Sequence, residues 1–188
     1  MMFVYNLLLN ALFILLLPFL PFAFIFGKKL RRGIGERLGI INKETLNKIK
    51  GRSIIWFHAA SVGETQALLP VISEFSKIND SMDIVITTTS INGRNKMREV
   101  MKEKALYVCL LPLDFNFIIA PFVAKINPKM AVVVETELWP NLIDRLHSRH
   151  VPMAMINGRI SVKSFRFYIR FKKFFSALIE KFTILMMQ

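Results

Sequence analysis

The stretch Ser53-Ile-Ile-Trp-Phe-His58, followed by Ala59-Ala-Ser-Val-Gly63 and an amphipathic run at 64–77, decides the fold class of this chain. A short, continuous apolar run bounded by small residues is typical of a buried strand, and a longer run with helical spacing is typical of a helix. The same change of pattern recurs along the chain. Strands that alternate with helices predict a Rossmann-like α/β fold, in which a parallel sheet carries helices on both faces.

The remaining elements follow from that alternation. After the strand at 53–58, further strands are expected at 83–88, 107–111, 130–134, 152–156 and 183–187. Helices are expected at 64–77, 91–102, 117–125 and 140–149, and one long helix is expected at 162–182. Residues 33–50 are expected to be a polar connector, because their glycine spacing does not match a dinucleotide-binding loop and no strand precedes them.

The N-terminal 27 residues contain no Lys, Arg, His, Asp or Glu and predict a membrane anchor. As a helix, residues 3–26 would reach roughly 36 Å, enough to cross a hydrocarbon core of about 30 Å. Pro18 and Pro21 each favour a kink, so a kinked spanning helix and a re-entrant helix both remain open. A cleavable signal peptide fits poorly, because no basic residue precedes the apolar run. We therefore expect an anchor at 1–27, a basic connector at 28–50 and a domain at 51–188.

The formal net charge of +13 indicates an acidic partner. An anionic bilayer, a phosphorylated substrate and nucleic acid are the candidates, and a solvated lysine-rich surface is the alternative. Lys28, Lys29, Arg31 and Arg32 directly follow the anchor and predict that the domain lies on the cytoplasmic side. The run at 162–182 interleaves basic residues with phenylalanines, as a helix on a bilayer surface does, or a core helix with a basic outer face. No nucleic-acid-binding signature is present, so no nucleic acid partner is expected.

The single cysteine, Cys109, lies in an apolar run, so no disulfide within the chain is possible and a buried structural thiol is expected.

The loop His58-Ala-Ala-Ser-Val-Gly-Glu64 is the first candidate site, because substrates bind where strands of an open α/β sheet end. Small residues such as Gly63 let a ligand approach the backbone, and the free N–H groups of a helix N-terminus attract anions. Ser61 and Glu64 have the spacing of a capping box, in which each side chain bonds to the other residue's amide. Glu64 is therefore a candidate catalytic carboxylate or a helix cap.

Two further candidate sites follow later strands. Glu135 and Glu137 come at the end of an apolar run, where a buried carboxylate suits acid or base chemistry. The alternative for Glu137 is that it caps the next helix. Arg159 and Arg94 also follow strands and are candidates to hold a phosphate or carboxylate, although turn residues surround both.

These motifs, in this order, resemble the N-terminal half of the Kdo transferase family, the 3-deoxy-D-manno-octulosonic acid transferases of lipopolysaccharide synthesis. The resemblance covers essentially the whole chain and is carried by Gly35-Glu-Arg-Leu-Gly39, His58-Ala-Ala-Ser-Val-Gly-Glu64, Thr87-Thr-Thr89, Leu111-Pro-Leu-Asp114, Glu135-Thr-Glu-Leu-Trp-Pro-Asn141, Asn157-Gly-Arg-Ile-Ser161 and Met187-Gln188.

The resemblance implies a two-domain GT-B glycosyltransferase at the cytoplasmic face of the inner membrane, independent of metals and without a cofactor. It would transfer Kdo from CMP-Kdo to a phosphorylated lipid A precursor. Glu64 would be the proton acceptor and Glu135 would stabilise the transition state. Substrate-binding roles are expected for Ser61, Gly63, Arg94, Glu137 and Arg159.

The family's nucleotide-binding motifs belong to a C-terminal domain that these 188 residues lack. Residues that hold the nucleotide therefore have no counterpart here, and we expect no transfer by this chain alone. The alternative to an acceptor-binding half-enzyme is a catalytically inactive, truncated membrane-bound module that binds anionic lipid.

Overall fold

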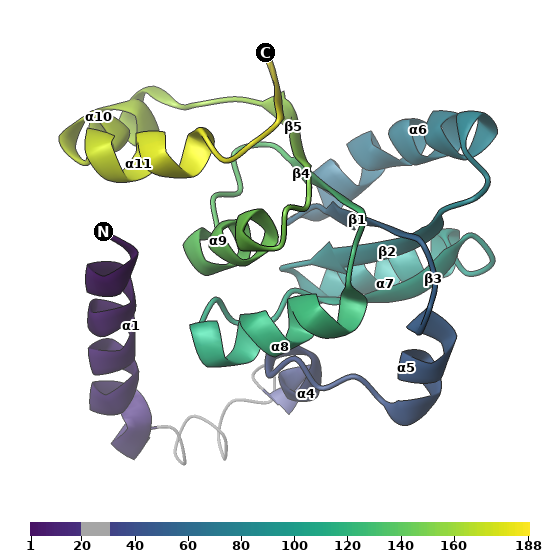
Figure 1. Ribbon diagram of the computed structural model, residues 1–188, viewed down its shortest axis with the longest axis horizontal. Coiled ribbons are helices and arrows are strands. Elements are labelled where there is room, and N and C mark those ends of the chain that lie inside the picture. The colour runs from purple at the N-terminus through teal and green to yellow at the C-terminus, as the bar shows by residue number, and fades with distance from the viewer. Residues whose placement is uncertain (20–30) are drawn as a thin grey trace.

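A six-stranded parallel sheet forms the centre of the molecule. The computed structural model describes residues 1–19 and 31–188 (Figure 1). The strand order is β3-β2-β1-β4-β5-β6, and every neighbouring pair is parallel. The strands are β1 Ile54–His58, β2 Asp83–Thr88, β3 Ala105–Leu110, β4 Met130–Val134, β5 Met153–Gly158 and β6 Ile184–Met187. The predicted Rossmann-like α/β fold is confirmed.

Helices cover both faces of the sheet, because alternate strand side chains point to opposite sides. Ile55 and Phe57 pack in one cluster with residues of α6 (Val62–Ile78) and α7 (Ile91–Val100). Ile54 and Trp56 point the other way, into a larger cluster that also contains residues of four further helices. These are α5 (Lys43–Ile49), α8 (Asn116–Ile126), α9 (Pro140–Ser148) and α11 (Lys172–Ile179). Cys109 is fully buried in the larger cluster, as expected, and burial raises the pKa of its thiol to about 12.

The single long helix expected at 162–182 is wrong. The structure has two helices, α10 (Val162–Arg170) and α11, separated by Phe171, whose φ of −114° and ψ of 36° are not helical. The bend lets α11 bury Leu178 against α9, while α10 buries none of its residues. A core-packing role for the basic stretch is therefore also wrong for α10, which lies on the surface.

The segment expected to be a polar connector is also folded. Its described part contains α4 (Ile34–Arg37) and α5, and α5 contacts both β3 and α8. Ile41 and Ile49 are buried in the larger core cluster. These two apolar side chains, one just before α5 and one at its last residue, pack the α5 segment onto the core.

The N-terminal apolar segment begins as a helix, α1 (Met2–Leu16), continued by a 3-10 turn at Leu17–Phe19 that contains Pro18. Pro21, Lys28 and Lys29 of the predicted anchor and basic cluster lie outside the described residues. Within the described residues, Met2–Phe19 is the one helical stretch long and apolar enough to cross a membrane, with a mean hydropathy of 2.1.

One side of α1 faces the domain. The half-buried residues of α1 form a single stripe at helical spacing, namely Met2, Tyr5, Asn6, Leu9 and Phe13. The aromatic ring of Phe13 lies 5.0 Å from that of Phe115, and the ring of Tyr5 lies 5.9 Å from that of Phe174, both measured between centroids. Figure 1 shows α1 upright beside α8 and α9, with α10 and α11 above it.

Candidate functional site

The candidate site lies where β1 has β2 on one side and β4 on the other. The connection after β1 leads to β2 on one side, and the connection after β4 leads to β5 on the other. Open α/β sheets bind ligands at such a position, in the crevice outside the carboxyl ends of the strands. The segments that leave β1 and β4 carry Glu64 and Glu135. The two candidate carboxylates, 71 positions apart in the sequence, thus follow neighbouring strands.

Glu64 lies in the first turn of α6 and forms the predicted capping box. The Ser61 hydroxyl accepts a hydrogen bond from the Glu64 amide at 3.2 Å. In return, Glu64 Oε1 accepts from the Ser61 amide at 3.2 Å and Oε2 accepts from the Ala60 amide at 2.7 Å. A carboxylate has about four acceptor positions, so the two bonds leave capacity for a further hydrogen-bond donor. Ser61 and Gly63 are both exposed beside it.

The loops after β1 and β2 are joined through one backbone carbonyl. Ala60 O accepts from the Thr89 hydroxyl at 2.9 Å and from the Ser90 amide at 3.2 Å. Ser90 is in turn the N-cap of α7 and accepts from the Gly93 amide. These bonds hold the backbone immediately before Glu64 in one conformation.

Glu135 follows β4 with an unusual backbone. Its φ is +59°, and its amide donates to Ile156 O on β5 at 2.9 Å. The other described non-glycine residues with positive φ are Asn127, His150 and Asn157, types that tolerate this region. A glutamate there costs of order 1–3 kcal/mol, and such strain concentrates at active sites and ligand-binding loops. The strained backbone therefore keeps Glu135 a candidate functional residue.

Glu137 does not cap the next helix. Its Oε2 accepts from the Trp139 indole N–H at 2.9 Å and lies 3.9 Å from His58 Nε2. The interaction with the His58 ring is the main reason that the pKa of Glu137 lies below its usual value, and Trp139 adds to the effect. Burial raises the pKa of Tyr168 on α10, and the Glu137 charge raises it further.

The cap of α9 is Asp114, which the sequence motifs contained but to which no role was assigned. Its two carboxylate oxygens accept from the amides of Asn141 and Leu142, both at 2.9 Å. Burial raises the pKa of Asp114 to about 6, although these two hydrogen bonds act in the opposite direction. The available signal was an acidic residue two positions after Pro112, close to the end of an apolar strand, but its partner lies 27 positions away in the sequence.

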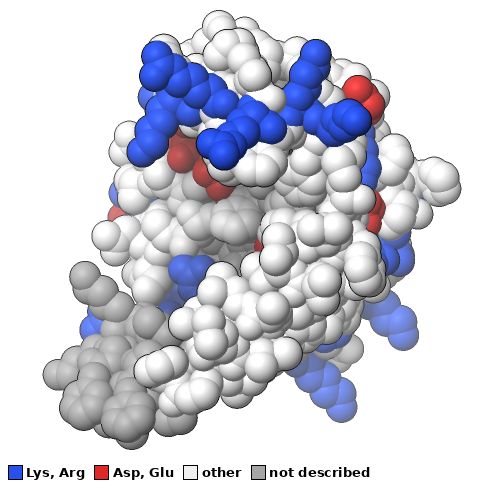
Figure 2. All heavy atoms as spheres, turned by 90° about the vertical axis from the view of Figure 1, so that its left-hand side faces the viewer, with Lys and Arg blue, Asp and Glu red and all other residues white. Residues whose placement is uncertain are grey.

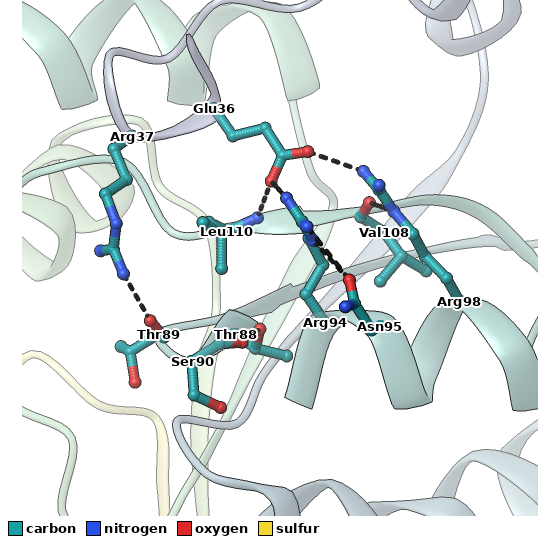
Figure 3. A network of polar contacts seen from close by, with 10 residues as sticks. All are labelled: Glu36, Arg37, Thr88, Thr89, Ser90, Arg94, Asn95, Arg98, Val108 and Leu110. Atoms are coloured by element: carbon teal, nitrogen blue, oxygen red, sulfur yellow. Dashed lines mark hydrogen bonds and ion pairs between the residues drawn. The ribbon is translucent and has the colours of Figure 1, made fainter. Parts of the chain in front are cut away.

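The two candidate arginines have different surroundings. Arg159 is exposed, and within residues 1–19 and 31–188 only its backbone is held, by bonds of its N–H and carbonyl to the Thr136 hydroxyl. Arg94 is only 12% exposed and donates to Glu36 Oε2 at 2.9 Å (Figure 3). Its guanidinium is therefore engaged in an internal ion pair, whereas that of Arg159 is open to a ligand.

Figure 3 shows that the Glu36 carboxylate of α4 accepts hydrogen bonds from two other elements. Besides Arg94, it accepts from Arg98 Nη2 at 2.7 Å and from the Leu110 amide at 2.9 Å. The adjacent Arg37 donates to Thr89 O at 2.7 Å. The Gly-Glu-Arg-Leu-Gly motif at 35–39 thus braces the carboxyl ends of β2 and β3.

Lys and Arg side chains gather on the face shown in Figure 2, mostly along its upper part, with acidic side chains directly below them. Exposed basic residues of α10, α11 and the bend between them are Lys163, Arg166, Arg170, Lys172 and Lys173. Exposed apolar side chains on the same segment include Phe165, Phe167 and Ile169, each more than half exposed. The segment therefore presents positive charge and apolar area together. Within residues 1–19 and 31–188, no three His, Cys, Asp or Glu side chains are grouped so as to hold a metal ion.

The chain is similar to one described protein family and to several curated proteins. Residues 32–188 match the family described as 3-deoxy-D-manno-octulosonic-acid transferase (kdotransferase). The 3-deoxy-D-manno-octulosonic acid transferase of Haemophilus influenzae is 30% identical over 93% of this chain and 40% of its own length. That of Chlamydia pneumoniae is 30% identical over 96% of this chain and 41% of its own. A probable mitochondrial enzyme of Arabidopsis thaliana is 34% identical over 61% of this chain and 25% of its own.

Proposed function

Because this chain belongs to the Kdo transferase family, we propose that it is the acceptor-binding half of a glycosyltransferase that moves Kdo from CMP-Kdo to a phosphorylated lipid A precursor. The chain spans about two fifths, or less, of the length of the curated relatives named above. In this proposal residues 51–188, with residues 34–49 packed against them, are the first domain of a GT-B enzyme. CMP-Kdo is bound chiefly by a second domain outside these 188 residues.

The main support for the proposal is that Glu64 and Glu135 lie in the segments that follow two neighbouring strands, β1 and β4. Ligands of such sheets bind at this place. Glu64 would accept the proton of the acceptor hydroxyl as that oxygen bonds to the anomeric carbon of Kdo, while the bond from this carbon to CMP breaks. Glu135 would stabilise the positive charge that develops on the sugar in the transition state.

The acceptor's phosphates require cations near these carboxylates. Arg159 follows β5, and its exposed guanidinium fits this role, whereas the pairing of Arg94 with Glu36 makes Arg94 a support of the loop rather than a phosphate ligand. Ser61, Gly63 and Glu137 line the same edge of the sheet, and we assign acceptor contacts to them.

The acceptor is a membrane lipid in this proposal, so the domain works against a bilayer, the inner membrane at its cytoplasmic face. Two features support this. The outer side of α1 is apolar and exposed, and α10 presents phenylalanines together with basic residues. Apolar side chains that enter the headgroup region combine with basic residues that attract anionic lipid.

Acceptor binding by the 188-residue chain, reconstituted in nanodiscs, tests the proposal. The chain should bind a bisphosphorylated lipid A precursor more tightly than the same lipid without its phosphates, and Arg159→Gln should reduce that preference. Equal binding of the two lipids would contradict the assignment of the acceptor.

Transfer is tested separately with labelled CMP-Kdo. The chain alone should give no product, and the complete enzyme should give a Kdo-bearing lipid. Turnover by the 188 residues alone would contradict the half-enzyme proposal. Binding by the complete gene product without any transfer would instead favour an inactive lipid-binding module.

A further inference from the structure

His58, the last residue of β1, is a buried polar side chain to which the reaction proposed above gives no role. It is 1% exposed and pairs in the sheet with Thr87 of β2 and Val133 of β4. Its partner Val133 lies two residues before Glu135 in the sequence, and His58 Nε2 lies 3.9 Å from Glu137 Oε2. The ring thus lies next to the loop that carries both glutamates.

The hydrogen bonds around Thr87 determine which ring nitrogen of His58 carries the proton. The Trp56 indole N–H can only donate, so the Thr87 hydroxyl accepts from it, at 2.8 Å. The hydrogen of that hydroxyl is then directed to His58 Nδ1, 2.9 Å away. A neutral imidazole whose Nδ1 accepts carries its proton on Nε2.

The opposite tautomer is disfavoured by the same contacts. In that tautomer an Nδ1–H would donate to the Thr87 carbonyl, 3.1 Å away, and the hydrogen of the Thr87 hydroxyl would lose Nδ1 as its acceptor. It would also leave an unprotonated Nε2 facing the Glu137 carboxylate, one acceptor against another. The hydrogen bonds from Trp56 to Thr87 and from Thr87 to His58 therefore leave the proton of the His58 ring on Nε2, the nitrogen that faces Glu137.

That N–H has no hydrogen-bond partner in the described part of the chain, although the nitrogen is fully buried. The nearest carboxylate oxygen, Glu137 Oε2, is about 1 Å too far for a hydrogen bond and is already held by Trp139. Hydrogen bonds of active sites are often long without substrate and shorten in its complex. A small inward movement of the 135–139 loop would complete the bond.

We propose that His58 is a positioning residue for the reaction: its Nε2–H anchors Glu137, and through it the loop that presents Glu135, when acceptor binds. The expected kinetic effect rests on the proposed function, whereas the expected tautomer of the His58 ring rests on the geometry alone. Trp139 donates to Glu137 from within the loop, so His58 is the donor that comes from the sheet.

The tautomer is tested on the 188-residue chain without any reaction, by ¹⁵N NMR of the imidazole nitrogens. His58 should carry its proton on Nε2. Thr87→Val should remove this preference because the hydroxyl is lost, and Thr87→Ser should keep it. A proton on Nδ1 in the unmodified chain would overturn the proposal, whether or not the protein is a transferase.

The kinetic consequence is tested in the complete enzyme. His58→Phe should lower kcat by up to about 100-fold with little change in KM for the donor, because a misplacement of about 1 Å at a catalytic group can cost that much. His58→Gln, which keeps an N–H near the position of Nε2, should recover most of that loss. In a Glu137→Gln background, His58→Phe should have no further effect.

Two kinetic results would refute the role of His58: equal losses for the Phe and Gln variants with unchanged melting temperature, or independent, multiplying losses in the double variant. Absence of transfer by the unmodified enzyme would instead refute the proposed function, and the NMR result would stand apart from it.

Discussion

The Tyr5 hydroxyl donates a hydrogen bond of 3.0 Å to Asp114, a residue 109 positions further along the chain. Asp114 at the same time caps α9, and the capped residue Asn141 donates from its side chain to Asn6 at 2.8 Å. Tyr5 and Asn6, two of the three polar residues of α1, thus meet the N-terminus of α9. Since α9 directly follows the Glu135–Trp139 loop, the first helix and the candidate site share one support.

This shared support should be sensitive to pH. Burial raises the pKa of Asp114 to about 6, above its ordinary 3.8, so the folded chain binds this proton more tightly than the unfolded chain. The contribution of Asp114 to the free energy of unfolding should therefore be greatest below about pH 4. It should fall by up to about 3 kcal/mol as the pH rises through 6. Denaturant unfolding at pH 4 and pH 7 measures it, and Asp114→Asn should flatten the difference. An unchanged pH profile in that variant would contradict the assignment.

The hydrogen bond between Tyr5 and Asp114 should stabilise the docking of α1. A double-mutant cycle of Tyr5→Phe and Asp114→Asn is expected to give a coupling of about 1–3 kcal/mol, because the acceptor is charged. Thermal unfolding in detergent or nanodiscs provides the four values. Phe3→Leu is the matched control, since Phe3 is 78% exposed and lies outside the half-buried stripe of α1. A coupling near zero would mean that α1 is held by its apolar contacts alone.

The ion pairs of Glu36 should contribute more to stability than an exposed pair of the same kind. Glu36 is 17% exposed and holds Arg94, Arg98 and the Leu110 amide, so Glu36→Gln should cost about 1–3 kcal/mol. Glu44→Gln breaks an exposed pair with Lys48 and should change the unfolding midpoint little. Equal effects of the two substitutions would argue against a bracing role for α4.

The sequence predicted those parts of the fold that depend on local patterns. The strands at 83–88 and 130–134 have the expected bounds, because each is an apolar run between turn residues. The break at Phe171 was missed because the pattern of basic and aromatic residues continues through it. The capping box of Ser61 and Glu64 was visible because its partners are three residues apart. The cap supplied by Asp114 and the pairing of Glu36 with Arg94 were not, since each joins segments far apart in the sequence.

Removing the charge of Glu64 should lower both the stability of the fold and the rate of transfer, and the two effects can be measured separately. In Glu64→Gln, one side-chain oxygen still accepts a backbone N–H, but the amide NH₂ faces the other N–H, so the loss of stability should be about 1 kcal/mol. A carboxamide cannot accept the proton of the acceptor hydroxyl, so transfer by the complete enzyme should fall about 10²- to 10⁴-fold.

The matched control separates the cap from the chemistry. Asn42→Ala removes the cap of α5, which accepts from the Thr45 amide at 2.7 Å, far from the candidate site in the sequence. It should cost a similar amount of stability and leave transfer unchanged. Unfolding midpoints and initial rates of Kdo transfer are measured for both variants. If Glu64→Gln loses activity only in proportion to its unfolded fraction, as Asn42→Ala would, Glu64 is a helix cap and the base must be sought elsewhere.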